Sequence, residues 1–235
     1  MKLYAIGDLH MPGGDDKPMD VFGENWTDHV AQIFTHWRER VGEEDVVLIP
    51  GDVTWAMQLR DAVPDLQAIS DLPGRKILCK GNHDYWWSTL SKVRAVLPEG
   101  MEALQHTVAD LGAAVVTGTR GWSFPQPGEQ QTEEDERILQ RELIRLEIGL
   151  QAAVRTALGR PIVVMLHYPP LYDQQRDTVF TRLLAQYPVH TVVYGHLHGQ
   201  AIHAGFRGVH EGIRYMLVSS DSLKFIPAEV PLDAE

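Results

Sequence analysis

Short apolar runs that each end in a cluster of polar residues constrain this chain more than any other feature. The run 76–80 is typical of a β-strand, and the tetrapeptide Gly-Asn-His-Asp follows it at once, at positions 81–84. An amide oxygen, an imidazole and a carboxylate therefore come together where a strand ends. Because α/β sheets carry their chemistry at strand ends, this pattern predicts a functional site there.

Four further apolar runs end in the same way. Residues 2–7 lead into Asp8 and His10, 45–49 into Asp52, 161–166 into His167, and 191–194 into His196 and His198. Side chains two residues apart on an extended segment point the same way, so each Asp or His pair can converge on one point. A solvated turn explains any single cluster, but it does not explain five clusters at successive strand ends. We therefore predict one site built from Asp8, His10, Asp52, Asn82, His83, Asp84, His167, His196 and His198.

The segments between these strands complete an α/β pattern. Helices are predicted over 26–40, 61–70, 132–158 and 178–187, two short strands over 103–117, and closing strands over 200–204 and 213–219. Asp177 is the expected cap of the last helix, and Thr132 opens the longest one. In the first helix Trp37 is expected in the core, with His29 and His36 on the surface. Any cut between residues 8 and 198 would split the predicted site, so we expect a single domain over 1–235.

The charge and the cysteine content limit the partners of the protein. The formal net charge of -11 argues against binding to duplex nucleic acid or to an anionic membrane, because both favour a basic surface. No apolar run approaches the ~18 residues of a membrane span. Cys79 is the sole cysteine of the sequence, which suits a reducing compartment, and we expect a cytoplasmic protein. The oligomeric state stays open.

The mixture of ligand types in the predicted site points to a metal centre. Carboxylate and amide oxygens together with imidazoles suit Mn, Fe or Zn. One ion cannot use this many ligands, whereas two ions ~3.5–4 Å apart can, provided that one carboxylate bridges them.

The ordered motifs resemble those of the calcineurin-like metallophosphoesterase superfamily, in a bacterial branch of predicted phosphohydrolases. The matching residues are Asp8-x-His10, Gly51-Asp52, Gly81-Asn82-His83-Asp84, His167 and Gly195-His196-x-His198. The resemblance implies two face-packed mixed β-sheets flanked by helices, a four-layer αββα sandwich. It also implies two divalent ions, with Mn favoured over Fe or Zn. One would be bound by Asp8, His10, Asp52 and His198, and the other by Asp52, Asn82, His167 and His196.

The same resemblance implies hydrolysis of a small phosphate mono- or diester. A hydroxide bridging the ions would be the nucleophile, His83 the general acid, and Asp84 the residue that orients His83. Two ions bring about +4, two carboxylates about -2 and the hydroxide about -1, which leaves roughly +1 for a phosphate. A non-catalytic scaffold of the same fold is an alternative, although such a protein is expected to lose ligands and none is missing. Hydrolysis of a non-phosphate ester or amide is another.

Three loops are expected to determine substrate specificity: 11–24, 118–131 and 168–177. Arg120 lies in the second loop among glycines, where it could bind an anion of the substrate or form a structural salt bridge. Tyr85, Trp86 and Trp87 follow the central motif. They could stack on a ring of the substrate, but burial against the sheet is the favoured interpretation.

Overall fold

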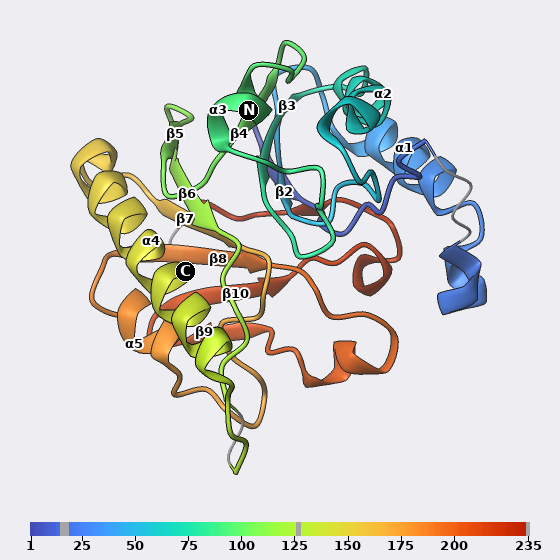
Figure 1. Cartoon of the computed structure of the whole chain (residues 1–235). Coiled ribbons are helices and arrows are strands. Elements are labelled where there is room, and N and C mark those ends of the chain that lie inside the picture. The colour runs from blue at the N-terminus through green and yellow to red at the C-terminus, as the bar shows by residue number, and fades with distance from the viewer. Residues whose placement is uncertain (15–18, 126–127, 234–235) are drawn as a thin grey trace.

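Two β-sheets form the centre of the molecule (Figure 1). The structure is a computed structural model and describes residues 1–14, 19–125 and 128–233. The first sheet has the order β11-β1-β2-β3-β4, with β11 (Ala228–Glu229), β1 (Leu3–Ala5), β2 (Val46–Pro50), β3 (Arg75–Cys79) and β4 (Met101–Ala103). The second has the order β5-β6-β7-β8-β10-β9, with β5 (Val108–Asp110), β6 (Val115–Thr119), β7 (Ile162–Leu166), β8 (Val189–Tyr194), β10 (Ile213–Leu217) and β9 (Gly208–His210).

Both sheets are parallel at their centres and antiparallel at their edges. Strands β1 to β4 pair in parallel, as do β6, β7, β8 and β10, whereas β11, β5 and β9 run antiparallel to their neighbours. The carboxyl ends of the parallel strands in each sheet therefore meet at one edge, where ligands bind in open α/β sheets.

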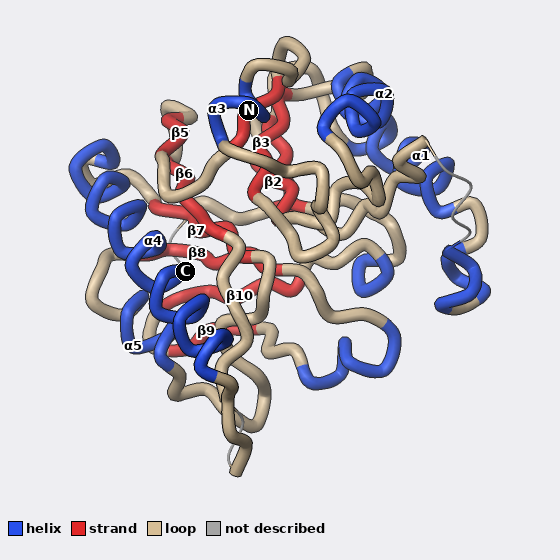
Figure 2. Tube along the Cα trace, viewed as in Figure 1, coloured by secondary structure: helices blue, strands red, loops and turns tan. Residues whose placement is uncertain are grey.

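Helices lie on the outer sides of the two sheets (Figure 2). They are α1 (His29–Arg40), α2 (Leu59–Ser70), α3 (Leu90–Arg94), α4 (Glu133–Ala157) and α5 (Val179–Leu184). Four short 3-10 helices, η1 (Met19–Phe22), η2 (Glu24–Trp26), η3 (Gly199–Ala204) and η4 (Asp221–Leu223), occur in the connections. Among the described residues, no helix is both long enough and apolar enough to cross a membrane.

Three apolar cores hold the layers together. Leu48 of β2 and Met165 of β7 share a core that lies between the two sheets. The neighbouring Ile49 faces the other way, into a second core with Trp37 of α1. A third core packs α4 and α5 against the second sheet. Because the central strands are apolar on both faces, they can be covered on both sides. The expected αββα sandwich is confirmed.

Most predicted elements occur within a few residues of their expected bounds, but two local predictions are wrong. The segment 200–204 forms the 3-10 helix η3 and not a strand, because β9 already occupies the edge of the sheet beside β10. The cap of α5 is Thr178 and not Asp177, since the Thr178 hydroxyl accepts hydrogen bonds from the N–H groups of Phe180 and Thr181. Asp177 is instead paired with Arg182. The predicted cap of α4, Thr132, is confirmed.

Candidate metal centre

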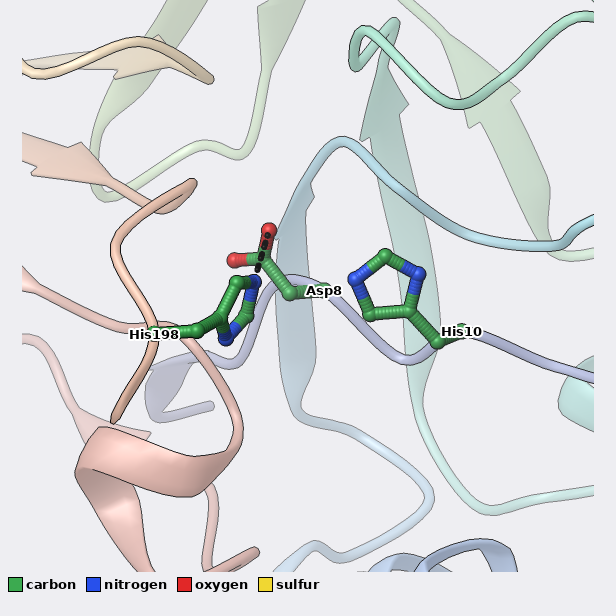
Figure 3. Close-up of side chains that lie close together, drawn as sticks. All are labelled: Asp8, His10 and His198. Atoms are coloured by element: carbon green, nitrogen blue, oxygen red, sulfur yellow. Dashed lines mark ion pairs between the residues drawn. The ribbon is translucent and has the colours of Figure 1, made fainter. Parts of the chain in front are cut away.

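The structure brings the five polar clusters together at the carboxyl ends of β1, β2, β3, β7 and β8. Asp8, His10 and His198 form a first group, in which one potential ligand atom of each residue lies within 4.8 Å of the others. Figure 3 shows the rings of His10 and His198 on either side of the Asp8 carboxylate. Asp8 and His198 are 190 positions apart in sequence, so this proximity is a product of the fold.

His198 is held between two carboxylates. Its Nδ1 lies 2.8 Å from Asp221 Oδ1, while its Nε2 lies 3.3 Å from Asp8 Oδ1 and is buried without a hydrogen-bond partner in the described structure. Burial lowers the pKa of His198, but Asp8 and Asp221 outweigh burial and raise it to about 10. The two carboxylates thus favour a positive charge at Nε2, whether a proton or a metal ion. An orphaned nitrogen beside a carboxylate fits a metal ligand.

A second group surrounds His167. Its Nδ1 donates a hydrogen bond to the Pro50 carbonyl oxygen at 3.0 Å, which leaves Nε2 as the free coordinating atom. That Nε2 lies 2.5 Å from Asn82 Oδ1 and 3.5 Å from Asp52 Oδ2. His196 Nδ1 completes the group, 2.9 Å from Asn82 Oδ1 and 3.2 Å from His167 Nε2. Asn82 Oδ1, His167 Nε2 and His196 Nδ1 therefore converge on one point.

Two carboxylates lie between the groups. Asp8 belongs to the first group and also to a set with Asp52 and His167, whose potential ligand atoms lie within 4.8 Å of one another. Asp52 Oδ2 lies 3.8 Å from His10 Nε2 and 3.5 Å from His167 Nε2, so it faces both groups through their free nitrogens. The contact of Asp8 with His167 is to Nδ1, which Pro50 already occupies.

The electrostatics of the centre suit divalent cations. Asp8 and Asp52 are 0% and 1% exposed, and burial followed by repulsion from Asp8 raises the pKa of Asp52 well above its usual value. Burial lowers the pKa of both His167 and His196 to about 3, which favours the neutral imidazole that binds metals. Two buried carboxylates at close range need compensating positive charge. The residues present therefore fit a metal centre.

The backbone of the centre is strained. Four of its non-glycine residues have left-handed φ angles: 57° at Asp8, 46° at His10, 51° at Asp52 and 74° at His196. Such conformations cost about 1–3 kcal/mol each and occur where the surrounding structure enforces them, often at functional sites.

Two glycines of the motifs leave room for the carboxylates. A Cβ atom at Gly81 would overlap Asp52 Oδ1, and one at Gly195 would overlap Asp8 Oδ2. The N–H of His196 donates to both oxygens of Asp8 at 3.1 Å. The carboxylates are thus seated directly against the backbone of other strand ends.

The Asp84 carboxylate makes no hydrogen bond to the His83 ring within the described residues, so its role in orienting His83 stays a prediction. Its fully buried carboxylate accepts hydrogen bonds from Trp86 Nε1 and from the N–H groups of Gly81, Asp52, Val53 and Thr54. Both oxygens are occupied in this way. Asp84 thereby fixes the turns that carry Asp52 and Asn82.

His83 is placed by other contacts. Its backbone N–H donates to Asp52 Oδ1 at 2.8 Å. Its ring lies against that of Trp55, with 4.6 Å between centroids, and its Nδ1 is 3.5 Å from the hydroxyl of Tyr85. The half-buried imidazole therefore stands at the rim of the centre, with its backbone tied to a predicted metal ligand.

Several residues around the site are not among those predicted from the sequence. Asp221 follows β10 in the run Ser-Ser-Asp, a further polar cluster at a strand end, and that signal could have identified it. Trp55 stacks on the His10 ring with 4.8 Å between centroids, and Trp26 lies 5.5 Å from the ring of His198. No spacing in the sequence indicates either tryptophan.

The prediction that His29 lies on the surface of α1 is wrong. The side chain is buried, its Nε2 is 3.1 Å from the His10 carbonyl oxygen, and its ring centroid is 5.3 Å from that of Trp26. The segment that precedes α1 folds over this face of the helix. His36 is partly buried, with Nδ1 at 3.1 Å from the Phe225 carbonyl oxygen.

The remaining candidates lie around the centre. Trp86 and Trp87 are buried, as favoured, whereas Tyr85 is 54% exposed. The Arg120 guanidinium lies 4.4 Å from the centroid of the Trp122 ring and has no salt bridge within the described residues. Of the three predicted specificity loops, 15–18 and 126–127 lie outside the described residues.

Comparisons with known proteins identify the family of the chain. Residues 1–200 match the family described as Calcineurin-like phosphoesterase. The Gene 66 protein of Mycobacterium phage L5 is 34% identical over 83 residues, which are 34% of this chain and 39% of the phage protein. The match thus spans about two fifths of that relative.

Two solved structures are similar to the whole chain. The Phosphopantetheinyl Hydrolase (PptH) from Mycobacterium tuberculosis has a TM-score of 0.60 at 18% identity, over 99% of this chain and 96% of that one. The Protein of Unknown Function AQ665 from Aquifex aeolicus has a TM-score of 0.49 at 14% identity, over 97% and 95%.

Proposed function

Because the chain belongs to the calcineurin-like phosphoesterase family, we propose that it is a metal-dependent hydrolase of phosphate mono- or diesters. The observation that carries the proposal is the convergence of two groups of donor atoms on both sides of Asp52, with His198 Nε2 buried beside Asp8 and without a hydrogen-bond partner in the described structure. The substrate is a small phosphate ester.

In this proposal two divalent ions occupy the centre, with Mn favoured over Fe or Zn by the mixture of oxygen and imidazole ligands. The first ion is bound by Asp8, His10, Asp52 and His198, and the second by Asp52, Asn82, His167 and His196. Asp52 is the shared ligand, because its Oδ2 faces the free Nε2 atoms of both His10 and His167.

When bound, two such ions would acidify a water molecule to give the nucleophile and would hold the phosphoryl oxygens. The residues of the chain supply the rest. His83 binds no metal in this scheme and donates a proton to the leaving oxygen. Asp84 and the motif glycines hold the Asp52 turn in place, and Arg120 binds an anionic oxygen of the substrate.

A substrate screen on the Mn-loaded protein tests this function. Nitrophenyl phosphate, bis-nitrophenyl phosphate, nucleotides and cyclic nucleotides cover both ester classes, and a phosphopantetheinyl ester joins them because PptH is named for that group. We expect turnover that a chelator abolishes and Mn restores. His10→Ala should abolish it, whereas the matched control His36→Ala, outside the centre, should retain it.

Two results would contradict the proposal. Full metal content without turnover of any ester would favour the non-catalytic scaffold. Turnover restricted to carboxylic esters or amides would favour the non-phosphate hydrolase.

A further inference from the structure

A basic cavity of about 380 Å³ is lined in part by Lys80 and Arg120, which follow the strands β3 and β6. Four cationic residues line it, Lys80, Arg120, Arg141 and Arg145, and the one carboxylate among its lining residues is Glu142. This concentration of positive charge stands out in a chain with a formal net charge of -11. Its charged residues come from the ends of β3 and β6 and from the middle of α4.

Two residues of the cavity lining adjoin segments that carry candidate metal ligands. Lys80 precedes the predicted ligand Asn82 by two residues, so their Cα atoms are at most about 7 Å apart. The Arg120 carbonyl oxygen accepts hydrogen bonds from the N–H groups of His167 and Tyr168, both at 3.0 Å. Two residues of the cavity lining are therefore joined through the backbone to segments that carry candidate metal ligands.

The cavity holds more positive charge than its own carboxylate can balance. Glu142 is 1% exposed, and Arg145 Nη1 lies 2.6 Å from its Oε1, so these two residues form a close pair. Arg141 Nε is more distant from the same oxygen, at 3.9 Å. The Lys80 ammonium donates to the Trp87 carbonyl oxygen at 3.2 Å, and in the described residues it forms no salt bridge.

One residue of the cavity lining has a hydrogen-bond donor without a partner in the described structure. Trp87 is one of its lining residues, and its buried indole Nε1 has no hydrogen-bond partner in the described structure. Buried donors normally find partners, so this indole N–H is unusual among the residues of the lining.

We propose that this cavity binds a second anionic group of the substrate, most simply a phosphate, while the reacting phosphate lies at the metals. The proposal rests on the proposed function and narrows its substrate class to phosphate esters that carry a further oxyanion. Arginine forks match phosphate oxygens in pairs, and lysine adds a point charge. The volume falls in the range of about 300–1,000 Å³ that ligand sites occupy.

Paired substrates test the proposal on the Mn-loaded enzyme. A nucleoside 3′,5′-bisphosphate is compared with the corresponding 5′-monophosphate in Arg141→Gln and Lys80→Gln. We expect KM for the bisphosphate to rise about tenfold in each variant, the loss of one charge-assisted hydrogen bond, with kcat retained. KM for the monophosphate should not change. Arg145 is left intact, because its removal would strand the buried Glu142.

Arg155→Gln is the matched control, since it removes the same charge from the exposed face of the same helix, outside the cavity. It should leave both KM values unchanged. Equal effects on both substrates in Arg141→Gln and Lys80→Gln, or no effect on either, would overturn the proposal. So would activation of monophosphate hydrolysis by free orthophosphate without competition, because the cavity would then serve a separate anion.

Binding without turnover separates this inference from the proposed function. Calorimetry compares methylphosphonate with alkane bisphosphonates of graded chain length on the same Mn-loaded proteins. One chain length of the bisphosphonates should bind more tightly than methylphosphonate. Arg141→Gln should lower the affinity for that bisphosphonate about tenfold, whereas Arg155→Gln should leave it unchanged. If the bisphosphonates bind more tightly than methylphosphonate but the protein hydrolyses no ester, the proposed function is wrong and the anion-binding cavity is supported. If the protein hydrolyses esters but the bisphosphonates bind no more tightly, the proposed function stands and the anion-binding cavity is wrong.

Discussion

Asp221 lies 2.8 Å from Nδ1 of His198 and thereby directs the other ring nitrogen, Nε2, toward Asp8. The same carboxylate accepts the N–H of Gly199 at 3.0 Å, so it also fixes the backbone that carries the histidine. A carboxylate that orients a metal-binding histidine is a recurrent feature of metal sites. The Asp221 carboxylate in η4, after the last parallel strand, has this position relative to His198, a proposed metal ligand.

Asp221→Asn should weaken metal binding by about 10–100-fold, because the neutral amide no longer favours positive charge on the ring. Competition with a chelating dye measures the affinity. Asp173→Asn, at an exposed carboxylate, is the control and should bind metal normally. An unchanged affinity in Asp221→Asn would show that the contact only shapes the loop.

The protein reconstituted in excess Mn should approach two ions per chain. Asp52→Asn should lower the affinity of both sites, because it removes a charge that faces both groups of ligands. Metal analysis after gel filtration gives the stoichiometry. A firm plateau at one ion in the parent protein would exclude a dinuclear centre.

His83→Ala should keep its full metal content and lose turnover by about 10²–10⁴-fold, the usual contribution of a positioned proton donor. The loss should be much larger for alkyl phosphates than for nitrophenyl phosphates, because nitrophenolate leaves without a proton. His196→Ala should lose metal and harm both substrate classes. If His83→Ala loses a metal ion, or harms both classes equally with chemistry rate-limiting, the general-acid role is wrong.

Asp84→Asn should lower the free energy of unfolding by about 3 kcal/mol. The amide offers one acceptor oxygen where the carboxylate serves five N–H donors, and its own N–H₂ group would face some of them. Urea denaturation measures the loss, with Asp177→Asn at a 79% exposed side chain as the control. Equal stability of the two variants would contradict the structural role of Asp84.

Lys76 should make the free energy of unfolding depend on pH in the alkaline range. Burial lowers its pKa from 10.5 to about 8, and its ammonium donates to the carbonyl oxygens of Ser70 and Leu72 near the end of α2. Between pH 8 and 10.5 the unfolded chain therefore binds more protons than the folded one, so stability rises with pH in this window.

The rise should reach at most about 3 kcal/mol and should be absent in Lys76→Met. Urea denaturation of the parent protein and of Lys76→Met across this window measures the difference between their free energies of unfolding. The contributions of other titrating groups cancel in this difference. A parallel pH dependence in the two proteins would mean that Lys76 keeps its ordinary pKa.

The fold and most of the site could be predicted because their signals are local. An apolar run followed by Gly-Asp or Gly-Asn-His-Asp defines a strand and its end within a few residues, and parallel strands place their carboxyl ends at one edge. Asp8, Asp52, Asn82, His167, His196 and His198 converge for this reason. Asp221 carries the same kind of signal, because it follows β10 in a polar run.

The amino-acid sequence by itself determined which side chains reach the carboxyl edge of the sheets, since strand ends and the alternation of side chains are written in neighbouring residues. Only the tertiary structure decided which atoms they contact there. Asp84 accepts hydrogen bonds from the turn at residues 52–54 and none from the ring of the adjacent His83 within the described residues, and Lys80 faces arginines that lie far from it in sequence. A hydrogen bond or a local excess of charge depends on separations of a few ångströms between segments that the chain brings together only on folding.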